Sequence, residues 1–301
     1  MVVGIFGATA SGKSELALAL ARRMPCEIVS VDAMQVYAGV ETLTNQPSAA
    51  ERAEVPHHLV GYLPLTAASS VGAHAPLAHA AIDAAAERGA LPLVVGGTGL
   101  YLRAALAELS LPPAVPAAER ARWERLYDER GASAAFAELE RRDARAAGRL
   151  HANDRRRVVR ALELAEQGAS LAPERDRLWG GGMRRTAVVA VVSWPRAELR
   201  ARIAARTDRM LSSGAVEEVR ALRNAGVEPS PTAARILGLE AIGAYLEGGR
   251  PLADVAAEIT LRTGQYARRQ GTWARRIPEV IELAGADGPE RNADRLLELI
   301  R

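Results

Sequence analysis

The chain has 301 residues and 49% of them are apolar, so it can bury the core of one large domain or of two moderate ones. No apolar run is long enough to span a bilayer, and a single cysteine, Cys26, excludes an internal disulfide and a four-cysteine zinc site. The formal net charge is only +3, and the 39 basic residues comprise 38 arginines and one lysine, Lys13. Because the chain runs from Met1 almost directly into its first motif, we expect no cleavable leader, no membrane association and a cytoplasmic protein.

The first hundred residues alternate between apolar runs and segments with helical spacing. The second apolar run ends at Asp32, the third ends at Gly96-Gly97, and Gly89 closes the helix between them. Strands that alternate with helices in this way favour a parallel sheet with helices on both faces. We expect strands at residues 2–6, 27–31 and 91–95, and helices at residues 14–23 and 79–88.

A glycine-rich turn joins the first predicted strand to the first predicted helix. It matches the pattern G-x-x-x-x-G-K-[ST] and consists of Gly7-Ala8-Thr9-Ala10-Ser11-Gly12-Lys13-Ser14. Its backbone N–H groups and the helix N-terminus can surround an anion, Lys13 adds positive charge, and Ser14 can bind Mg²⁺. A compact ammonium reaches between two phosphates better than a planar guanidinium does, which explains the one lysine in an arginine-rich chain. The motif predicts a phosphate-binding loop for a di- or triphosphate.

The sequence changes character at Pro112-Pro113. Residues 117–167 are dense in charge, and their apolar residues keep amphipathic helical spacing. A loop rich in glycine and proline over 169–185 leads to one more apolar strand, residues 187–193, after which the chain is helical nearly to its end. We therefore expect an α/β fold with a P-loop NTPase-like parallel-sheet core, residues 1–111 and 186–301, and a helical insertion domain, residues 112–185.

A phosphate-binding loop does not settle which phosphate chemistry it serves. An ATPase or GTPase usually presents an aspartate after an apolar strand to hold the metal. The third predicted strand leads instead into Gly96-Gly97-Thr98-Gly99, which contains no acid. Asp32 is then the nearest carboxylate, and we expect Asp32 and Thr98 to face Lys13 at the carboxyl ends of the strands. Asp32 is a metal ligand, a proton acceptor for a nucleophile, or a turn or N-cap residue.

Further motifs occur in order along nearly the whole chain. They are Val31-Asp32-Ala33-Met34-Gln35-Val36-Tyr37, Thr44-Asn45-Gln46-Pro47, Val55-Pro56-His57-His58-Leu59, Val95-Gly96-Gly97-Thr98-Gly99-Leu100-Tyr101, Asn153-Asp154-Arg155-Arg156-Arg157, Gly214-Ala215-Val216-Glu217-Glu218-Val219 and Gln265-Tyr266-Ala267-Arg268-Arg269-Gln270-Gly271-Thr272-Trp273. Together with the loop, they make the chain resemble the tRNA dimethylallyltransferases, also called isopentenyl-tRNA transferases. Many families share the loop, whereas D-x-x-Q-x-Y, G-G-T-G-L-Y and R-R-Q-x-T-W in this order are far more specific.

The resemblance implies transfer of a dimethylallyl group from dimethylallyl diphosphate to N6 of the adenosine 3′ of the anticodon in tRNA, with release of pyrophosphate. Residues 7–14 would bind the donor's diphosphate with Mg²⁺ on Ser14, and Lys13, Arg157 and Arg206 would stabilise the leaving group. Asp32 would act as general base, and Thr98 would orient the reactants. The partner is the tRNA anticodon stem-loop, and we expect a monomer. The residues implied to contact tRNA are Asp32, Ala33, Met34, Gln35, Thr98, Arg120, Arg156, Arg157, Arg160, Arg235 and Glu240.

Some residues depart from the family pattern. Ala33 stands where the family usually has serine, Gln46 where lysine is common, and Gly264 where arginine is common. Leu239 and Glu240 occupy positions where the family more often has Tyr-Lys or Tyr-Arg, and a glutamate repels a phosphate that a lysine attracts. The sequence leaves open whether Gln46 and Glu240 weaken RNA binding or shift it.

Two other functions fit parts of the sequence. In a small-molecule kinase the loop would hold ATP and Asp32 would accept a hydroxyl proton, but the long helical insertion and G-G-T-G-L-Y argue against it. A non-catalytic, nucleotide-gated RNA-binding protein would explain the arginine clusters but leaves Asp32 and Thr98 without a task. We interpret His57 and His58 as structural rather than metal-binding residues. Four late arginines either contact RNA or form a solvated or salt-bridged face: Arg268, Arg269, Arg275 and Arg276.

Overall fold

The computed structural model describes residues 1–109, 115–172 and 182–300 of the chain. It contains two compact units, one made of Met1–Glu108 with Gly182–Arg301 and the other of Leu109–Gly181. The predicted boundary at Pro112-Pro113 and much of the predicted loop over 169–185 lie outside the described residues. Within the first unit the chain leaves and returns at neighbouring points, because Ala107 pairs with Met183 in an antiparallel bridge. The second unit is thus inserted into the first.

The first unit is built on a six-stranded sheet in which every pairing is parallel. Strand β1 lies inside the sheet, paired with β4 on one side and β5 on the other, and all its residues are buried. This burial on both faces explains its continuous apolar run. The order is β3-β2-β4-β1-β5-β6, with bounds β1 Val2–Gly7, β2 Cys26–Ser30, β3 His57–His58, β4 Leu91–Gly96, β5 Ala187–Ser193 and β6 Val280–Ala284.

The prediction of a helical chain from Pro195 nearly to the end is wrong at β6. This strand lies at the sheet edge, beside β5, and only Leu283 in it is fully buried. An edge strand with one buried residue has no continuous apolar run, so its periodicity does not reveal it. The two-residue β3 at the opposite edge is too short to give any pattern.

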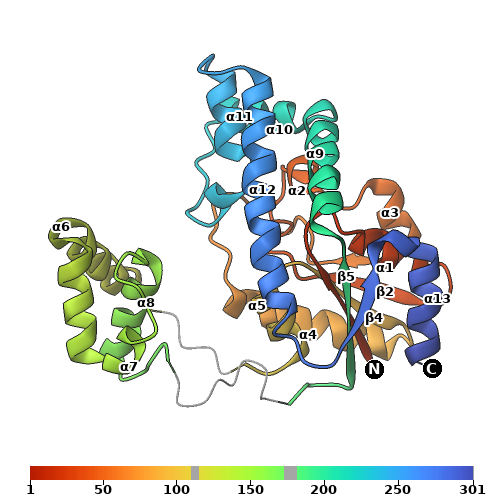
Figure 1. Ribbon diagram of the computed structural model, residues 1–301, viewed down its shortest axis with the longest axis horizontal. Helices are drawn as coiled ribbons and strands as arrows, with labels where there is room; N and C mark the ends of the chain where they lie inside the picture. Colours follow the sequence, from red (N-terminus) through yellow and green to blue (C-terminus); the bar gives the residue numbers. More distant parts are fainter. Residues whose placement is uncertain (110–114, 173–181, 301) are drawn as a thin grey trace. The chain divides into compact units, whose positions relative to one another are not determined.

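Helices pack on both faces of the sheet, as predicted (Figure 1). Val3 and Ile5 of β1 belong to an apolar cluster with α1 and α13. On the opposite face of the strand, the Gly4 position lies against Leu102 and Leu106 of α5. The helices of this unit are α1 Lys13–Ala21, α2 Glu41–Thr44, α3 Ala49–Glu54, α4 Val71–Glu87, α5 Gly99–Leu106, α9 Arg196–Ser212, α10 Ala215–Asn224, α11 Leu239–Leu246, α12 Leu252–Ala274 and α13 Gly288–Ile300, with 3-10 turns η1 Ala233–Arg235 and η2 Gly285–Asp287.

Helix α4 begins eight residues before the predicted start at residue 79. The Ser70 side chain accepts a hydrogen bond from the Ala73 N–H and so caps the helix there. Pro76 lies within the helix, and because proline usually marks a helix boundary, the sequence pattern predicted a start after it. The predicted end is confirmed, since Gly89 follows the last turn with a φ of +77°.

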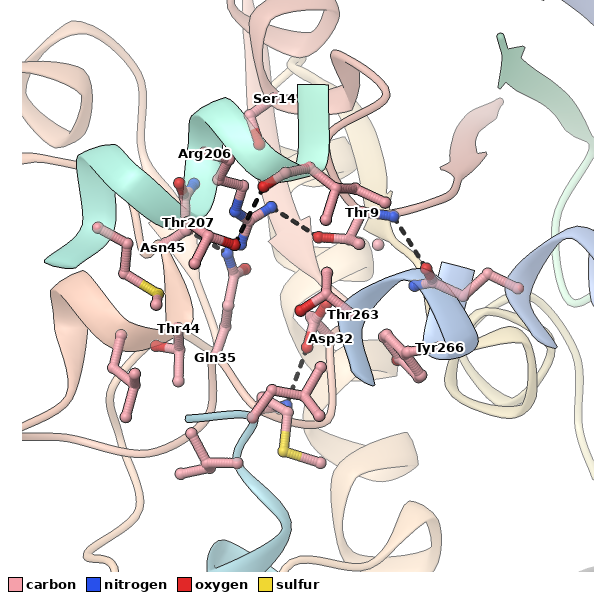
Figure 2. Close-up of a pocket in the computed structure, with 18 of the residues that line it drawn as sticks. Thr9, Ser14, Asp32, Gln35, Thr44, Asn45, Arg206, Thr207, Thr263 and Tyr266 are labelled. Atoms are coloured by element: carbon pink, nitrogen blue, oxygen red, sulfur yellow. Dashed lines mark hydrogen bonds between the residues drawn. The ribbon is translucent and has the colours of Figure 1, made fainter. Parts of the chain in front are cut away.

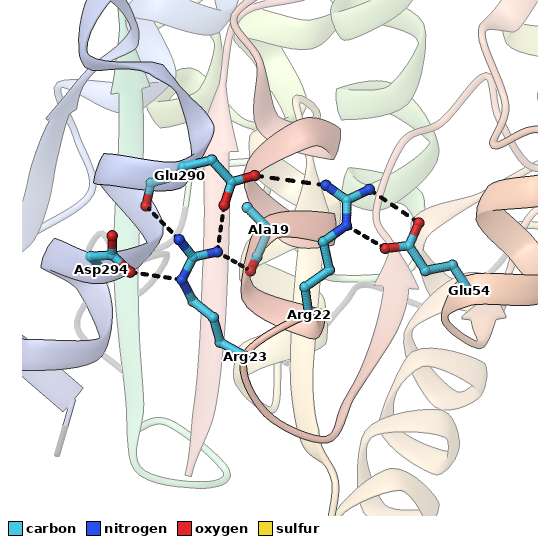
Figure 3. A network of polar contacts seen from close by, with 6 residues as sticks. All are labelled: Ala19, Arg22, Arg23, Glu54, Glu290 and Asp294. Carbon is cyan, nitrogen blue, oxygen red and sulfur yellow. Dashed lines mark hydrogen bonds and ion pairs between the residues drawn. The ribbon is translucent and has the colours of Figure 1, made fainter.

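A surface network joins three helices beyond the end of α1 (Figure 3). Arg22 pairs with Glu54 of α3, and Arg23 pairs with Glu290 and Asp294 of α13. Exposed ion pairs contribute little to stability. The network therefore orients the ends of these helices rather than holding the fold together.

The second unit is helical, as predicted for residues 117–167. It contains α6 Ala117–Arg142, α7 Ala144–Ala147 and α8 Arg155–Glu166. Helix α6 bends at Gly131, whose φ of +83° is outside the helical region. Trp123 and Leu139 of α6 pack with Leu162 of α8 in the unit's own apolar core. In the described residues of both units, no helix is long and apolar enough to cross a membrane.

Candidate active site

The turn between β1 and α1 has the backbone of an anion-binding loop. A Cβ on Gly7 would lie 2.7 Å from the Val192 carbonyl oxygen, and Gly12 has a φ of +98°, so both positions require glycine. Gly12 caps α1 without a side-chain hydrogen bond, which leaves the first N–H groups of the helix available. The Lys13 ammonium donates to the Ala8 carbonyl oxygen at 2.7 Å and so lies over the loop. The loop thus gathers positive charge around an open position for an anion.

Side chains from α9 and from the link between β5 and α9 hold the loop from outside. Arg202 Nε donates to the Ala10 carbonyl at 2.8 Å. Arg206 Nη1 donates to Thr9 Oγ1 at 2.7 Å (Figure 2). Trp194 Nε1 donates to the Ser11 carbonyl at 2.8 Å, and Arg202 stacks 4.3 Å from the centre of its ring. These contacts hold Ala10 at a φ of +63°, which is uncommon for a residue with a side chain. Sequence reasoning missed Arg202 and Trp194, because their partners lie more than 180 positions away.

A pocket next to the loop brings together three of the predicted catalytic residues. Lys13 of α1, Asp32 just after β2 and Arg206 of α9 all line it. Figure 2 shows Asp32 and Arg206 on its walls. Ser14 and Gln35 line it as well. The rest of the lining is largely apolar and includes Met34, Leu43, Ile203, Met210, Ile236 and Ile259. The pocket can therefore take a ligand with a charged end and an apolar end.

The two cations of this pocket, Lys13 and Arg206, are partly buried and have no carboxylate in contact. Burial lowers the pKa of Lys13 to about 8, although the negative charge of Asp32 opposes the shift. Burial also lowers the pKa of Arg206. Among the described residues, neither forms an ion pair, and both donate to neutral oxygens. An anionic ligand would relieve this unfavourable electrostatic state.

Asp32 and Thr98 are anchored close to each other through Ala33. Asp32 Oδ1 accepts the Met34 N–H at 2.9 Å, which is the turn geometry considered from the sequence. Its Oδ2 accepts no hydrogen bond from a described residue. The Ala33 N–H donates to Thr98 Oγ1 at 3.3 Å, and this hydroxyl is 3.3 Å from the Tyr266 hydroxyl. Thr98 is not among the residues that line the pocket, so its contact with the site runs through the Asp32 turn and Tyr266.

Two glutamines near the pocket, the predicted RNA-contact residue Gln35 and the family departure Gln46, make hydrogen bonds to neighbouring groups of the chain. The Gln35 amide accepts from Ser30 Oγ at 3.0 Å and donates to the Asn45 carbonyl at 2.6 Å. Gln46 is buried and donates to the Tyr37 carbonyl at 2.7 Å, so a buried backbone contact accounts for this departure from the family pattern.

The segment around 235–240 is partly core and partly surface. Leu239 is buried in an apolar cluster, whereas Arg235 and Glu240 are exposed, and Glu240 pairs with Arg262 at 3.3 Å. A Cβ on Gly264 would meet no atom within 4 Å, so this position has room for a side chain.

The other predicted arginines lie in the second unit. Arg120 and Arg160 both contact Glu163, each at 2.8 Å, and the Glu163 side chain is only 1% exposed. Arg157 is largely exposed, 3.6 Å from Asp154. Arg156 is on the same first turn of α8. Because these residues belong to a different unit from the pocket, their contacts with diphosphate and tRNA stay predictions.

Helix α12 supplies a wall of the pocket that sequence reasoning missed. Ile259, Thr263, Tyr266 and Gln270 recur at helical spacing and all line it. This spacing is visible in the sequence, but it does not reveal which element the face covers. The four late arginines are exposed, and among the described residues none lies within ion-pair distance of a carboxylate: Arg268, Arg269, Arg275 and Arg276.

The two adjacent histidines are structural, as interpreted. His57 Nδ1 is 2.8 Å from the Val55 carbonyl oxygen, and His58 Nε2 is 2.6 Å from Glu27 Oε2. Arg88 also pairs with Glu27, and these partners hold the pKa of the Glu27 carboxyl at about 2. Within the described part of the chain, no three His, Cys, Asp or Glu side chains are grouped for a metal ion.

Comparisons with known proteins identify the family of the chain. An IPP transferase family model matches residues 35–277, and an isopentenyl transferase model matches residues 1–57. The chain is 40% identical to a tRNA dimethylallyltransferase of Nocardia farcinica, over 95% of the chain and 90% of that protein, and 40% identical to one of Kineococcus radiotolerans, over 99% and 96%. A crystal structure of a tRNA isopentenylpyrophosphate transferase from Bacillus halodurans superposes with a TM-score of 0.68 at 29% identity, over 99% of each chain. The chain belongs to the tRNA dimethylallyltransferase (IPP transferase) family.

Proposed function

We propose that this protein transfers a dimethylallyl group from dimethylallyl diphosphate to N6 of the adenosine 3′ of the anticodon in tRNA. The observation that carries the proposal is the single pocket in which Lys13, Arg206 and Asp32 meet an apolar lining. The charged end suits a diphosphate and the apolar end a five-carbon chain. Family membership supplies the acceptor, since the relatives are named for their action on tRNA.

In the reaction, the C1–O bond to the diphosphate breaks as the bond between C1 and N6 forms. Negative charge grows on the departing pyrophosphate, and Lys13 and Arg206, which have no carboxylate partner, stabilise it. Asp32 accepts one N6 proton through Oδ2, while the Met34 N–H holds Oδ1 in place. Thr98, which touches both the Asp32 turn and Tyr266, orients the acceptor through these two neighbours.

The residues of the loop fit a Mg²⁺ ion that arrives with the diphosphate. Ser14 is exposed at the start of α1 and lines the pocket, so its hydroxyl is the side-chain ligand that would hold the ion. Mg²⁺ is commonly bound by few protein groups together with phosphate oxygens and water, which agrees with the lack of an acidic cluster among the described residues. When bound, the ion supplies further charge neutralisation at the diphosphate.

The helical unit is the part we assign to the anticodon stem-loop. Its exposed arginines, with Arg157 the most exposed of those in ion pairs on α8, suit contacts with phosphates. Arg157 is proposed to reach the diphosphate as well. We further propose that the protein is cytoplasmic and that it is a monomer. Size-exclusion chromatography with light scattering tests the monomeric state.

The deciding experiment incubates the protein with Mg²⁺, radiolabelled dimethylallyl diphosphate and unmodified tRNA. We expect label in the tRNA at the adenosine 3′ of the anticodon and an equal amount of pyrophosphate. Asp32→Asn should bind dimethylallyl diphosphate but transfer about 10²–10⁴-fold more slowly. If the wild type moves no label but phosphorylates a metabolite from ATP, the kinase alternative is correct. Full transfer by Asp32→Asn would remove the general-base role.

A further inference from the structure

Gln270 is the most buried polar residue of the α12 wall, with 2% of its surface exposed. Its amide makes two hydrogen bonds to backbone groups far away in sequence. Oε1 accepts the Thr9 N–H at 2.8 Å, and Nε2 donates to the Gly97 carbonyl oxygen at 3.0 Å. One side chain thus ties the phosphate-binding loop to the turn after β4.

The packing around this amide leaves little freedom. A Cβ on Gly97 would lie 2.0 Å from Gln270 Nε2, and a Cβ on Gly99 would lie 2.4 Å from the Trp273 ring. Both glycines of the turn are therefore needed for α12 to approach it so closely. The close approach fixes the amide between its two partners.

The two partners belong to opposite ends of the proposed reaction. Thr9 accepts a hydrogen bond from Arg206 through its hydroxyl and so lies on the diphosphate side. Gly97 precedes Thr98, which contacts the Asp32 turn on the adenine side. The Gln270 amide is thus a direct link between the groups that hold the donor and those that hold the acceptor.

We propose that Gln270 is a positioning residue that sets the distance between the dimethylallyl donor and the adenine acceptor. The inference rests on the proposed function. Gln270 contributes to catalysis through Thr9 and Gly97, and the reacting atoms must lie within about 3–3.5 Å for bond formation. Misplacement by about 1 Å can cost about 100-fold in rate.

The test compares two substitutions of similar size. Gln270→Met removes both hydrogen bonds. Gln270→Glu keeps the acceptor for the Thr9 N–H but, when ionised, sets a carboxylate against the Gly97 carbonyl oxygen. For both variants we expect kcat to fall about 10- to 100-fold, with KM for each substrate within about threefold of wild type, because the binding groups remain.

The pH profile separates positioning from a merely structural role. The carboxyl group that Gln270→Glu introduces can, when protonated, donate to the Gly97 carbonyl as the glutamine amide does, and burial favours its protonated form. The ratio of kcat for Gln270→Glu to kcat for wild type should therefore rise several-fold as the pH is lowered from 8 to 6. For Gln270→Met this ratio should stay constant, because methionine does not titrate.

Asn224→Asp is the matched control, since it makes the same amide-to-carboxylate change at an exposed position at the end of α10. It should leave kcat and its pH profile unchanged. Two outcomes would overturn the positioning role alone. One is a Gln270→Glu variant as active as an active wild type. The other is a variant with a higher KM and a lower melting temperature whose kcat ratio to wild type does not rise at low pH. A wild type that binds dimethylallyl diphosphate but never transfers it would instead overturn the proposed function, and the positioning role with it.

Discussion

The pocket of the first unit and the helices of the second unit use arginine in opposite ways. In the pocket, the cations donate to neutral oxygens, Lys13 to a carbonyl and Arg206 to a hydroxyl, and Arg202 beside the pocket likewise donates to a carbonyl of the loop. In the helical unit, the arginines pair with carboxylates, as Arg120 and Arg160 do with Glu163.

The two arrangements have different electrostatic consequences. Carboxylate partners raise the pKa of Arg120, whereas burial without such a partner lowers the pKa of Lys13 and of Arg206. A cation without a carboxylate keeps its full charge for a ligand, and a paired cation supports the fold. The comparison indicates that the pocket is organised for an anion and that much of the charge in the helical unit is structural.

The largest expected effect comes from removing the unpaired cations. Lys13→Ala and Arg206→Ala should each slow transfer about 10²–10³-fold, or roughly 3–4 kcal/mol, which is typical of losing a donor to a developing anion. Neither should lower the melting temperature of the unliganded protein, because each removes a desolvated charge. Single-turnover transfer and calorimetry measure the two quantities. A clear loss of stability in both variants would mean that these cations are structural, as in the helical unit.

The converse experiment breaks the paired arrangement of the helical unit. Glu163→Gln leaves Arg120 and Arg160 around a neutral amide and should destabilise this unit by about 1.5–3 kcal/mol, the range for hydrogen bonds to charged groups. Faster hydrogen exchange in α6 and α8, with unchanged exchange in the sheet, is the expected readout. Glu140→Gln, at an exposed position of α6, is the control and should change neither. Equal effects of the two substitutions would show that the Glu163 pairs are not structural.

The lowered pKa of Lys13 gives the pocket a pH dependence that carboxylate-paired arginines lack. Above its pKa of about 8 the unliganded ammonium loses its proton, so affinity for dimethylallyl diphosphate should fall roughly tenfold from pH 7 to pH 9. The unliganded protein should instead gain stability as pH rises from about 8 towards 10.5, because the unfolded chain keeps this proton longer. Calorimetric titration without tRNA measures the affinity. Lys13→Arg should remove the pH dependence, and an unchanged profile in that variant would assign it to another group.

The smallest effect is expected at the surface network of Figure 3. Arg23→Ala removes the ion pairs to Glu290 and Asp294, but both partners remain hydrated. Stability should change little, and even less at high salt, because exposed pairs are screened. Thermal unfolding at low and high salt checks this. A loss as large as that of Glu163→Gln would show that exposure does not distinguish the two kinds of pair.

Local patterns determined much of the fold and the centre of the site. The apolar run before Gly7 and the helical spacing after Lys13 placed the loop between β1 and α1, because the periodicity of a strand or a helix is visible in neighbouring residues. The predicted end of the second strand before Asp32 and the parallel order of the strands placed Asp32 near Lys13. The R-R-Q-x-T-W motif pointed to the family but not to what its glutamine contacts.

Only the tertiary structure decided which distant groups complete the site. Gln270 reaches Thr9 across 261 positions, and Trp194 and Arg202 reach the same loop from just after β5 and from α9. Such contacts depend on how helices pack against the sheet, and no local period encodes the partner of a side chain. The sequence did not predict the edge strand β6 for a related reason, because its pairing with β5 rather than its own pattern makes it a strand. The sequence by itself determined the loop, Asp32 and the family, whereas packing decided that the pocket's cations meet neutral oxygens and that α12 joins its two ends.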